Sequence, residues 1–211
     1  MQALASEQTA TVFIVDDDPA VRDAIRWLME QVKLRVQVCS SADEFFASYT
    51  PGTRACLILD IRMPGMSGLE LQERLKAAGE LLPIVVITGH GDISIAVRAM
   101  KAGAVEFLQK PFNDQVLLDA VQSALTKFGP LWDQEARRQE SNKISSSLTK
   151  RETEVLNLLR TGKPNKSVAT LLGISVRTVE GHRATIMSKM GARSIGELIE
   201  MLHASDRAEL R

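Results

Sequence analysis

Short apolar runs alternate with amphipathic segments through the first 127 residues of the chain. The runs are nearly continuous in β-branched and other apolar residues, which is typical of strands buried on both faces of a sheet. Five successive strand-then-helix units predict a doubly wound α/β domain, with a five-stranded parallel sheet between two layers of helices. The predicted strands are Val12–Val15, Val36–Cys39, Cys56–Leu59, Ile84–Thr88 and Val105–Leu108.

The pattern changes after Lys127. Gly129-Pro130 is expected to interrupt the last helix of the α/β domain, because proline removes a backbone donor and clashes inside a helix. The polar residues that follow favour a linker that is partly helical, and a long kinked helix continuing to about Ser141 is the alternative. We therefore predict a first domain at 10–127, a linker at 128–147 and a second domain at 148–205.

The second domain has helical periodicity throughout and is predicted to be an all-α cluster of four helices. Capping boxes at Thr149–Glu152 and Ser194–Glu197 open the first and the last helix. Between them, a short helix at Asn165–Leu172, a turn at Gly173 and a longer helix at about Ser175–Met190 have the spacing of a helix-turn-helix.

Acidic residues follow two of the predicted parallel strands. Asp16–Asp18 directly follow the first strand and Asp60 directly follows the third, while Thr88 and Lys110 lie at the ends of the fourth and fifth. Because the carboxyl ends of parallel strands share one edge of a sheet, these side chains are expected to converge. The acids have two interpretations, as loop residues that cap helices or as a site for a hard cation such as Mg²⁺.

Lys110 and Thr88 favour a site for phosphoryl chemistry. An ammonium, a hydroxyl and Mg²⁺ can each contact one oxygen of a phosphoryl group that is transferred to a carboxylate nucleophile, here Asp60. A Mg²⁺-dependent phosphohydrolase with the same nucleophile is the alternative from the enzyme class. The sequence offers it no extra cap domain and no obvious substrate pocket.

The segments around these residues resemble a two-component receiver domain over about residues 10–127. LILDIRMPGMSGLE surrounds Asp60, VITGHGD surrounds Thr88 and MKAGAVEFLQKPF surrounds Lys110. The resemblance implies a flavodoxin-like fold with Asp60 as the phosphoacceptor. It also implies Mg²⁺ as cofactor, held by Asp17, Asp60 and the backbone carbonyl of Arg62, with Asp16 acting through water.

The same resemblance implies a switch. Thr88 and Phe107 would be the switch pair, and Lys110 the phosphate-sensing lysine, followed by a cis peptide bond to Pro111. Without the resemblance, an ordinary core aromatic at the end of a strand is the preferred interpretation of Phe107.

Charge separates the two halves of a chain whose formal net charge is zero. Residues 1–127 carry 16 acidic and 12 basic side chains, and residues 128–211 carry 10 and 14. A basic half favours a polyanionic partner such as DNA. Val179, Ile186 and Met190 form the predicted core face of the longer helix of the helix-turn-helix motif.

The opposite face of that helix is polar, as is the start of the helix before it. A recognition helix reads base edges in the major groove, while neighbouring amides and lysines hold phosphates. Four-helix clusters with mixed charged faces also form dimers or dock proteins, which is the alternative here. The candidate DNA contacts are Asn165, Lys166, Ser175, Arg177, Thr178, Glu180, His182 and Arg183.

The segment from LTKRETEVL to IGELI is similar to LuxR-type effector domains, so the whole chain resembles FixJ-like members of the FixJ/NarL response regulators. The resemblance implies a transcription factor, not a conventional enzyme, that a sensor histidine kinase phosphorylates on Asp60. Its partners would be double-stranded DNA, a second copy of the chain and RNA polymerase. A DNA-binding protein with a passive receiver is a further alternative. Glu180 departs from the lysine of some relatives, and it is expected to change the DNA site rather than abolish binding.

Composition excludes several other classes. Aromatic residues make up 4% of the chain, too few for a surface that stacks single-stranded bases. No stretch approaches the roughly 18 apolar residues of a membrane span, and no Lys or Arg precedes the first apolar run, so we expect a cytoplasmic protein without a secretory signal. Cys39 and Cys56 lie in apolar runs and are expected to be inert core thiols.

Overall fold

The computed structural model of the chain describes residues 10–89, 93–194 and 196–199. The chain forms two compact units that divide between Gln134 and Glu135, inside the segment predicted as a linker. The strands of the first unit are β1 (Thr11–Val15), β2 (Arg35–Cys39), β3 (Ala55–Asp60), β4 (Ile84–Thr88) and β5 (Glu106–Gln109). They are all parallel and lie in the order β2-β1-β3-β4-β5, which confirms the doubly wound, flavodoxin-like prediction.

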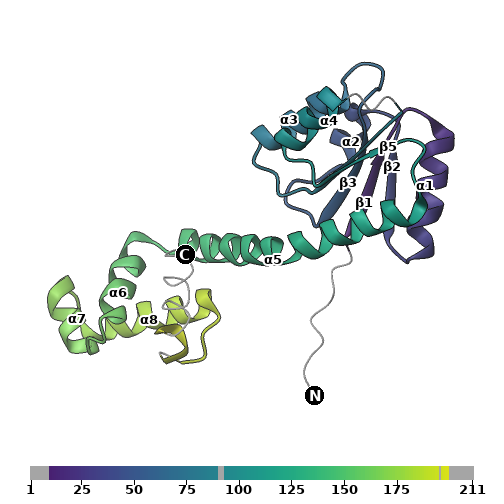
Figure 1. The fold of residues 1–211 in the computed structure, drawn as a ribbon. Helices are drawn as coiled ribbons and strands as arrows, with labels where there is room; N and C mark the ends of the chain where they lie inside the picture. The colour runs from purple at the N-terminus through teal and green to yellow at the C-terminus, as the bar shows by residue number, and fades with distance from the viewer. Residues whose placement is uncertain (1–9, 90–92, 195, 200–211) are drawn as a thin grey trace. The chain divides into compact units, whose positions relative to one another are not determined.

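Helices cover both faces of this sheet (Figure 1). One layer consists of α1 (Pro19–Gln31) and α5 (Asp114–Ser147), and the other of α2 (Ala42–Ser48), α3 (Gly68–Ala77) and α4 (Ile93–Ala102). Successive side chains of a strand point to opposite faces, so Ile14 and Ile58 pack under the first layer while Val15 and Leu59 pack under the second. Every residue of β3 is buried, because both layers cover the centre of the sheet.

The predicted interruption at Gly129-Pro130 is wrong, because α5 runs without a break from Asp114 to Ser147 with Pro130 inside it. The alternative of a long helix is the one observed, and the helix extends beyond Ser141. At 34 residues it is still not a candidate membrane span, since no described helix is both long and apolar enough to cross a membrane.

Contacts beyond the proline explain why the helix continues. An interior proline costs a helix about 3 kcal/mol or more. Two residues later, the buried Trp132 donates a hydrogen bond from its indole Nε1 to the carbonyl oxygen of Leu81 at 2.7 Å. Asp133 forms an ion pair with Arg54, just before β3. Burial of a large side chain contributes a stabilisation of the same size as the cost of the proline, so packing overrides the local signal.

The helical second unit confirms the helix-turn-helix prediction. Its described helices are α6 (Lys150–Arg160), α7 (Asn165–Leu172) and α8 (Val176–Met190), and residues 196–199 are also helical. Gly173 ends α7 in the left-handed conformation, with φ of 64°, and Ser175 caps α8 by accepting from the amide of Thr178. The rest of the predicted fourth helix, at 195 and 200–205, lies outside the described residues.

Cys39 and Cys56 are both buried and neither forms a disulfide. Burial raises the pKa of the Cys39 thiol, and it raises that of Cys56 to about 12. Both are therefore protonated core residues at neutral pH, as predicted.

Candidate functional site

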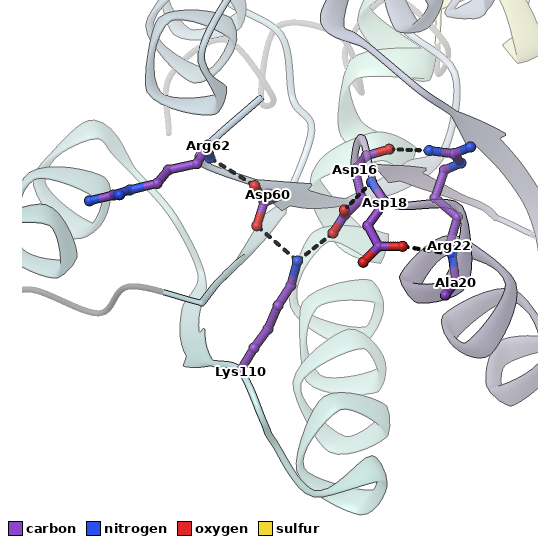
Figure 2. Close-up of polar contacts among 7 residues, drawn as sticks. All are labelled: Asp16, Asp18, Ala20, Arg22, Asp60, Arg62 and Lys110. Atoms are coloured by element: carbon purple, nitrogen blue, oxygen red, sulfur yellow. Dashed lines mark hydrogen bonds and ion pairs between the residues drawn. The ribbon is translucent and has the colours of Figure 1, made fainter. Parts of the chain in front are cut away.

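The carboxyl ends of β1 and β3 and the residue that follows β5 bring three charged side chains together (Figure 2). Lys110 Nζ donates hydrogen bonds to Asp16 Oδ2 at 2.6 Å and to Asp60 Oδ1 at 2.9 Å. Asp16 is 1% exposed and Asp60 is 4% exposed, so the ammonium bridges two carboxylates that are almost entirely shielded from water. The expected convergence at this edge of the sheet is observed.

Backbone amides hold the two carboxylates in place, and a guanidinium holds the main chain at Asp16 (Figure 2). The amide of Asp18 donates to Asp16 Oδ1 at 3.0 Å, and the amide of Arg62 donates to Asp60 Oδ2 at 2.8 Å. From α1, Arg22 Nη1 donates to the carbonyl oxygen of Asp16 at 2.6 Å. The role of Arg22 is not evident from the sequence, because only the packing of α1 beside β1 brings its guanidinium over the end of that strand.

The charges of this site influence one another strongly. Burial raises the pKa of Asp60, and the hydrogen bond from Lys110 only partly counteracts this. Burial also lowers the pKa of Lys110, but hydrogen bonds to Asp16 and Asp60 more than offset it, so its pKa is raised. Lys110 is therefore a firmly protonated cation placed against Asp60, where an incoming anionic group would meet positive charge.

Thr88 lies on β4, the neighbour of β3 in the sheet, and Phe107 lies on β5, the edge strand beyond β4. Thr88 is fully buried at the end of β4, and its carbonyl oxygen accepts from the amide of Lys110 at 2.8 Å. Phe107 is half-buried on β5 and packs against the apolar cluster that also contains Ala99 of α4. The peptide bond between Lys110 and Pro111 is cis, as the resemblance implied.

Only some of the metal ligands predicted from the sequence lie in the buried site beside Lys110. Asp17 is exposed, unlike its neighbour Asp16. Within the described ranges, no three acidic, histidine or cysteine side chains are close enough to form a ready metal site. The donor set nevertheless fits Mg²⁺, because it consists of carboxylate and carbonyl oxygens, and the main chain of Arg62 lies directly beside the Asp60 carboxylate.

In the second unit, four of the predicted DNA contacts bond to one another. The guanidinium of Arg183 donates to Asn165 Oδ1, which joins α8 to the start of α7. Ser175 Oγ accepts from the amide of Thr178 at 3.0 Å, and the two hydroxyls lie 2.8 Å apart. The first pair stabilises the packing of α8 on α7, and the second stabilises the start of α8.

The other four predicted contacts lie open on the surface. In the part of the chain that the structure describes, none of their side chains has a hydrogen-bond or ion-pair partner, and three of the residues are exposed while His182 is half-buried. Opposite them, Val179 and Ile186 are fully buried and Met190 packs on the same core, as predicted. The open residues are Lys166, Arg177, Glu180 and His182.

Comparison with known families identifies both units. Residues 12–122 match the response regulator receiver domain, and residues 146–202 match the bacterial regulatory proteins of the luxR family. The chain belongs to the response regulators. It joins a receiver domain to a luxR-type DNA-binding domain, the arrangement of a transcriptional regulator in a two-component system.

Full-length relatives of this response regulator share both units. It is 40% identical over 211 residues to the transcriptional regulatory protein TdiR of Thauera aromatica, covering 98% of this chain and 93% of the relative. It is 44% identical over 194 residues to the transcriptional regulatory protein FixJ of Azorhizobium caulinodans, covering 92% of each. Among solved structures, the response regulator StyR is similar with a TM-score of 0.79 at 44% identity, covering 93% of this chain and 99% of that one.

Gly68 of this response regulator is a second residue whose role is not evident from the sequence. Its amide donates to the carbonyl oxygen of Ile61 at 2.9 Å, which ties the start of α3 to the end of β3. A Cβ at this position would lie 2.1 Å from the carbonyl oxygen of Asp60 and 2.9 Å from Ile61 Cα. The sequence shows only that a glycine directly follows the cap residue Ser67. The close approach of Gly68 to Asp60 is a feature of the tertiary structure.

Proposed function

We propose that a partner sensor histidine kinase phosphorylates Asp60, and that this promotes dimerisation and DNA binding by the response regulator. The observation that carries the proposal is the Lys110 ammonium, which bridges the buried carboxylates of Asp16 and Asp60. An Asp60 oxygen attacks the phosphorus atom, the bond from phosphorus to the kinase histidine nitrogen breaks, and an acyl phosphate forms. Lys110 and the Thr88 hydroxyl then contact the phosphoryl oxygens.

The metal ligands in this proposal are Asp17, Asp60 and the backbone carbonyl of Arg62, with Asp16 acting through water. When bound, Mg²⁺ would neutralise part of the phosphoryl charge. The protein's own residues prepare the site without it. The amide of Arg62 orients Asp60 Oδ2, and the amide of Asp18 orients Asp16 Oδ1.

Thr88 and Phe107 are proposed to relay the change. Thr88 would move toward the phosphoryl group and Phe107 would turn inward, altering the surface made by α4, β5 and α5, on which a second copy of the chain would pair. The burial of Thr88 beside Lys110 and the packing of Phe107 against the apolar cluster that contains Ala99 of α4 support this route. A complete switch, from 1:99 to 99:1, requires a differential stabilisation of about 5.5 kcal/mol.

DNA binding is proposed to use the open residues of α7 and α8. A dimer would place two copies of α8 in successive major grooves of a two-fold site, with half-sites about 10 base pairs apart. Lys166 and Arg177 are exposed, and their side chains have no partners among the described residues, which suits contacts with phosphates and base edges. RNA polymerase is a further proposed partner. We also propose that the protein binds DNA in the cytoplasm.

The test compares wild type with Asp60→Asn in the presence of Mg²⁺ and beryllofluoride or acetyl phosphate. The wild type is expected to change from monomer to dimer and to bind DNA more tightly, while Asp60→Asn stays monomeric because it lacks the acceptor carboxylate. Asp43→Asn, which removes an exposed acid from the first turn of α2, should behave as wild type. Molar mass in solution and DNA titration measure both properties.

Two results would contradict the proposal. If wild type and Asp60→Asn respond equally, the receiver does not control DNA binding through Asp60, and it is a passive scaffold. If the protein turns over added phosphomonoesters with Mg²⁺, it is an enzyme of the phosphohydrolase type rather than a phosphoacceptor.

A further inference from the structure

Glu180 is an acidic residue in the N-terminal half of α8, the helix that is proposed to enter the major groove. Glu180 is exposed, and its carboxylate has no hydrogen-bond or ion-pair partner among the residues that the structure describes. Arg177 and Arg183 lie three residues to either side, yet neither pairs with it, and the Arg183 guanidinium bonds to Asn165 instead. The carboxylate is therefore not used within the protein.

An unpaired acid on this surface is costly unless the DNA offers it a donor, because the phosphate backbone is negatively charged. Val179 and Ile186 are fully buried and fix which face of α8 packs on the core, so Glu180 lies on the part of the helix surface that is exposed. Beside it, Gly181 and Ala184 are small and exposed, and a Cβ added at Gly181 would meet no atom within 4 Å. This side of α8 can therefore approach a base edge closely.

We propose that Glu180 is a specificity residue that accepts a hydrogen bond from the N4 amino group of a cytosine. In the major groove, only cytosine N4 and adenine N6 donate, and adenine places the acceptor N7 beside its donor, which would repel a carboxylate. Each half-site then requires a C·G pair at one position. This inference rests on the proposed function of α8 as the DNA-reading helix.

The test selects sites from a random pool of duplex DNA, using the full-length protein activated with beryllofluoride. Wild type is expected to select cytosine at one position of each half-site, and exchange of that base should weaken binding about tenfold, or about 1.4 kcal/mol. Glu180→Gln should select adenine there, because an amide side chain pairs with adenine N6 and N7. Glu180→Ala should select no particular base at that position.

Glu154→Gln is the matched control, since it removes an exposed acid of the same domain that is paired with Arg151 on α6. It is expected to keep the cytosine preference. The inference is overturned if Glu180→Ala and Glu180→Gln still select cytosine, or if they only raise affinity for all sequences equally. An activated wild type that binds no DNA would overturn the proposed function as well, so the two failures are distinguishable.

Discussion

The acids at the sheet edge differ in their contacts and burial, and these differences indicate which of them can act as a nucleophile. Asp16 and Asp60 share the Lys110 ammonium, whereas Asp17, next in the chain to Asp16, is exposed. The carbonyl oxygen of Asp60 also faces Gly68 at a distance that leaves no room for a side chain. The position of Asp60 therefore depends on a residue that takes no part in the chemistry.

Gly68→Ala is expected to lower the free energy of unfolding of the receiver by about 1–3 kcal/mol, the usual range for an overpacked site. The added methyl must push the start of α3 away from β3, so the rate of phosphorylation by acetyl phosphate should fall too. Gly181→Ala in α8, where a Cβ would meet no atom within 4 Å, is the control and should not destabilise the chain. Equal stability and equal phosphorylation rates for Gly68→Ala and wild type would contradict this.

At the scale of elements, one buried carboxylate joins α6 to α8 and to the end of α5. Glu152 Oε2 accepts from Lys189 Nζ and from the amide of Thr149, each at 2.7 Å, and Lys189 Nζ also donates to the carbonyl oxygen of Ser147 at 2.9 Å. The hydrogen bond from Lys189 is the largest cause of a Glu152 pKa lowered to about 2. The capping box predicted from the sequence thus belongs to a wider network.

This network predicts how stability depends on pH. The unfolded chain binds a proton on Glu152 near the ordinary glutamate pKa of 4.5, and the folded chain does so only near pH 2. The stabilisation is therefore complete above about pH 5 and lost progressively as the pH falls toward 2. Glu152→Gln should destabilise the second unit at neutral pH and flatten this acid dependence, whereas Glu154→Gln should leave it unchanged.

Circular dichroism and fluorescence together measure this effect, because Trp27 and Trp132 are the only tryptophans and both lie in the first unit. Fluorescence follows the first unit alone, and the helical signal follows both units. The unfolding of the second unit is seen in the helical signal and not in the fluorescence. If its stability depends on pH in the same way in wild type and Glu152→Gln, the assignment to this carboxylate is refuted.

For the whole molecule, α5 is the element that passes from one unit into the other, with its proline inside the helix. Trp132, 7% exposed, and the ion pair between Asp133 and Arg54 hold the helix against the receiver after Pro130. The helix is therefore maintained by tertiary contacts where its own sequence disfavours it.

Trp132→Ala should destabilise the receiver by about 3 kcal/mol and increase amide hydrogen exchange in α5 after Pro130, because the anchor is lost. Trp132→Phe keeps the apolar packing but leaves the Leu81 carbonyl without its donor, so a loss of about 1 kcal/mol is expected. Leu131→Ala removes a neighbouring side chain that is 42% exposed and should have little effect. Unchanged exchange after Pro130 in Trp132→Ala would show that the helix does not depend on this anchor.

The sequence by itself determined the alternation of strands and helices, the helix-turn-helix spacing and the convergence of Asp16, Asp60 and Lys110. These follow from periodicity, capping and the rule that parallel strands end at one edge, all of which act over a few residues or through topology. The roles of Thr88, Phe107 and the metal ligands stay predictions that rest on the family.

Tertiary structure alone decided the rest. The hydrogen bond from Trp132 to Leu81 joins residues 51 apart in the chain and keeps α5 helical through Pro130, against the local signal. Packing likewise placed Arg22 over Asp16, set Gly68 against Asp60 and paired Arg183 with Asn165, which left Glu180 open. Such contacts depend on how whole elements pack. Sequence spacing does not specify them, even for Arg22 and Asp16, which are only 6 residues apart in the chain.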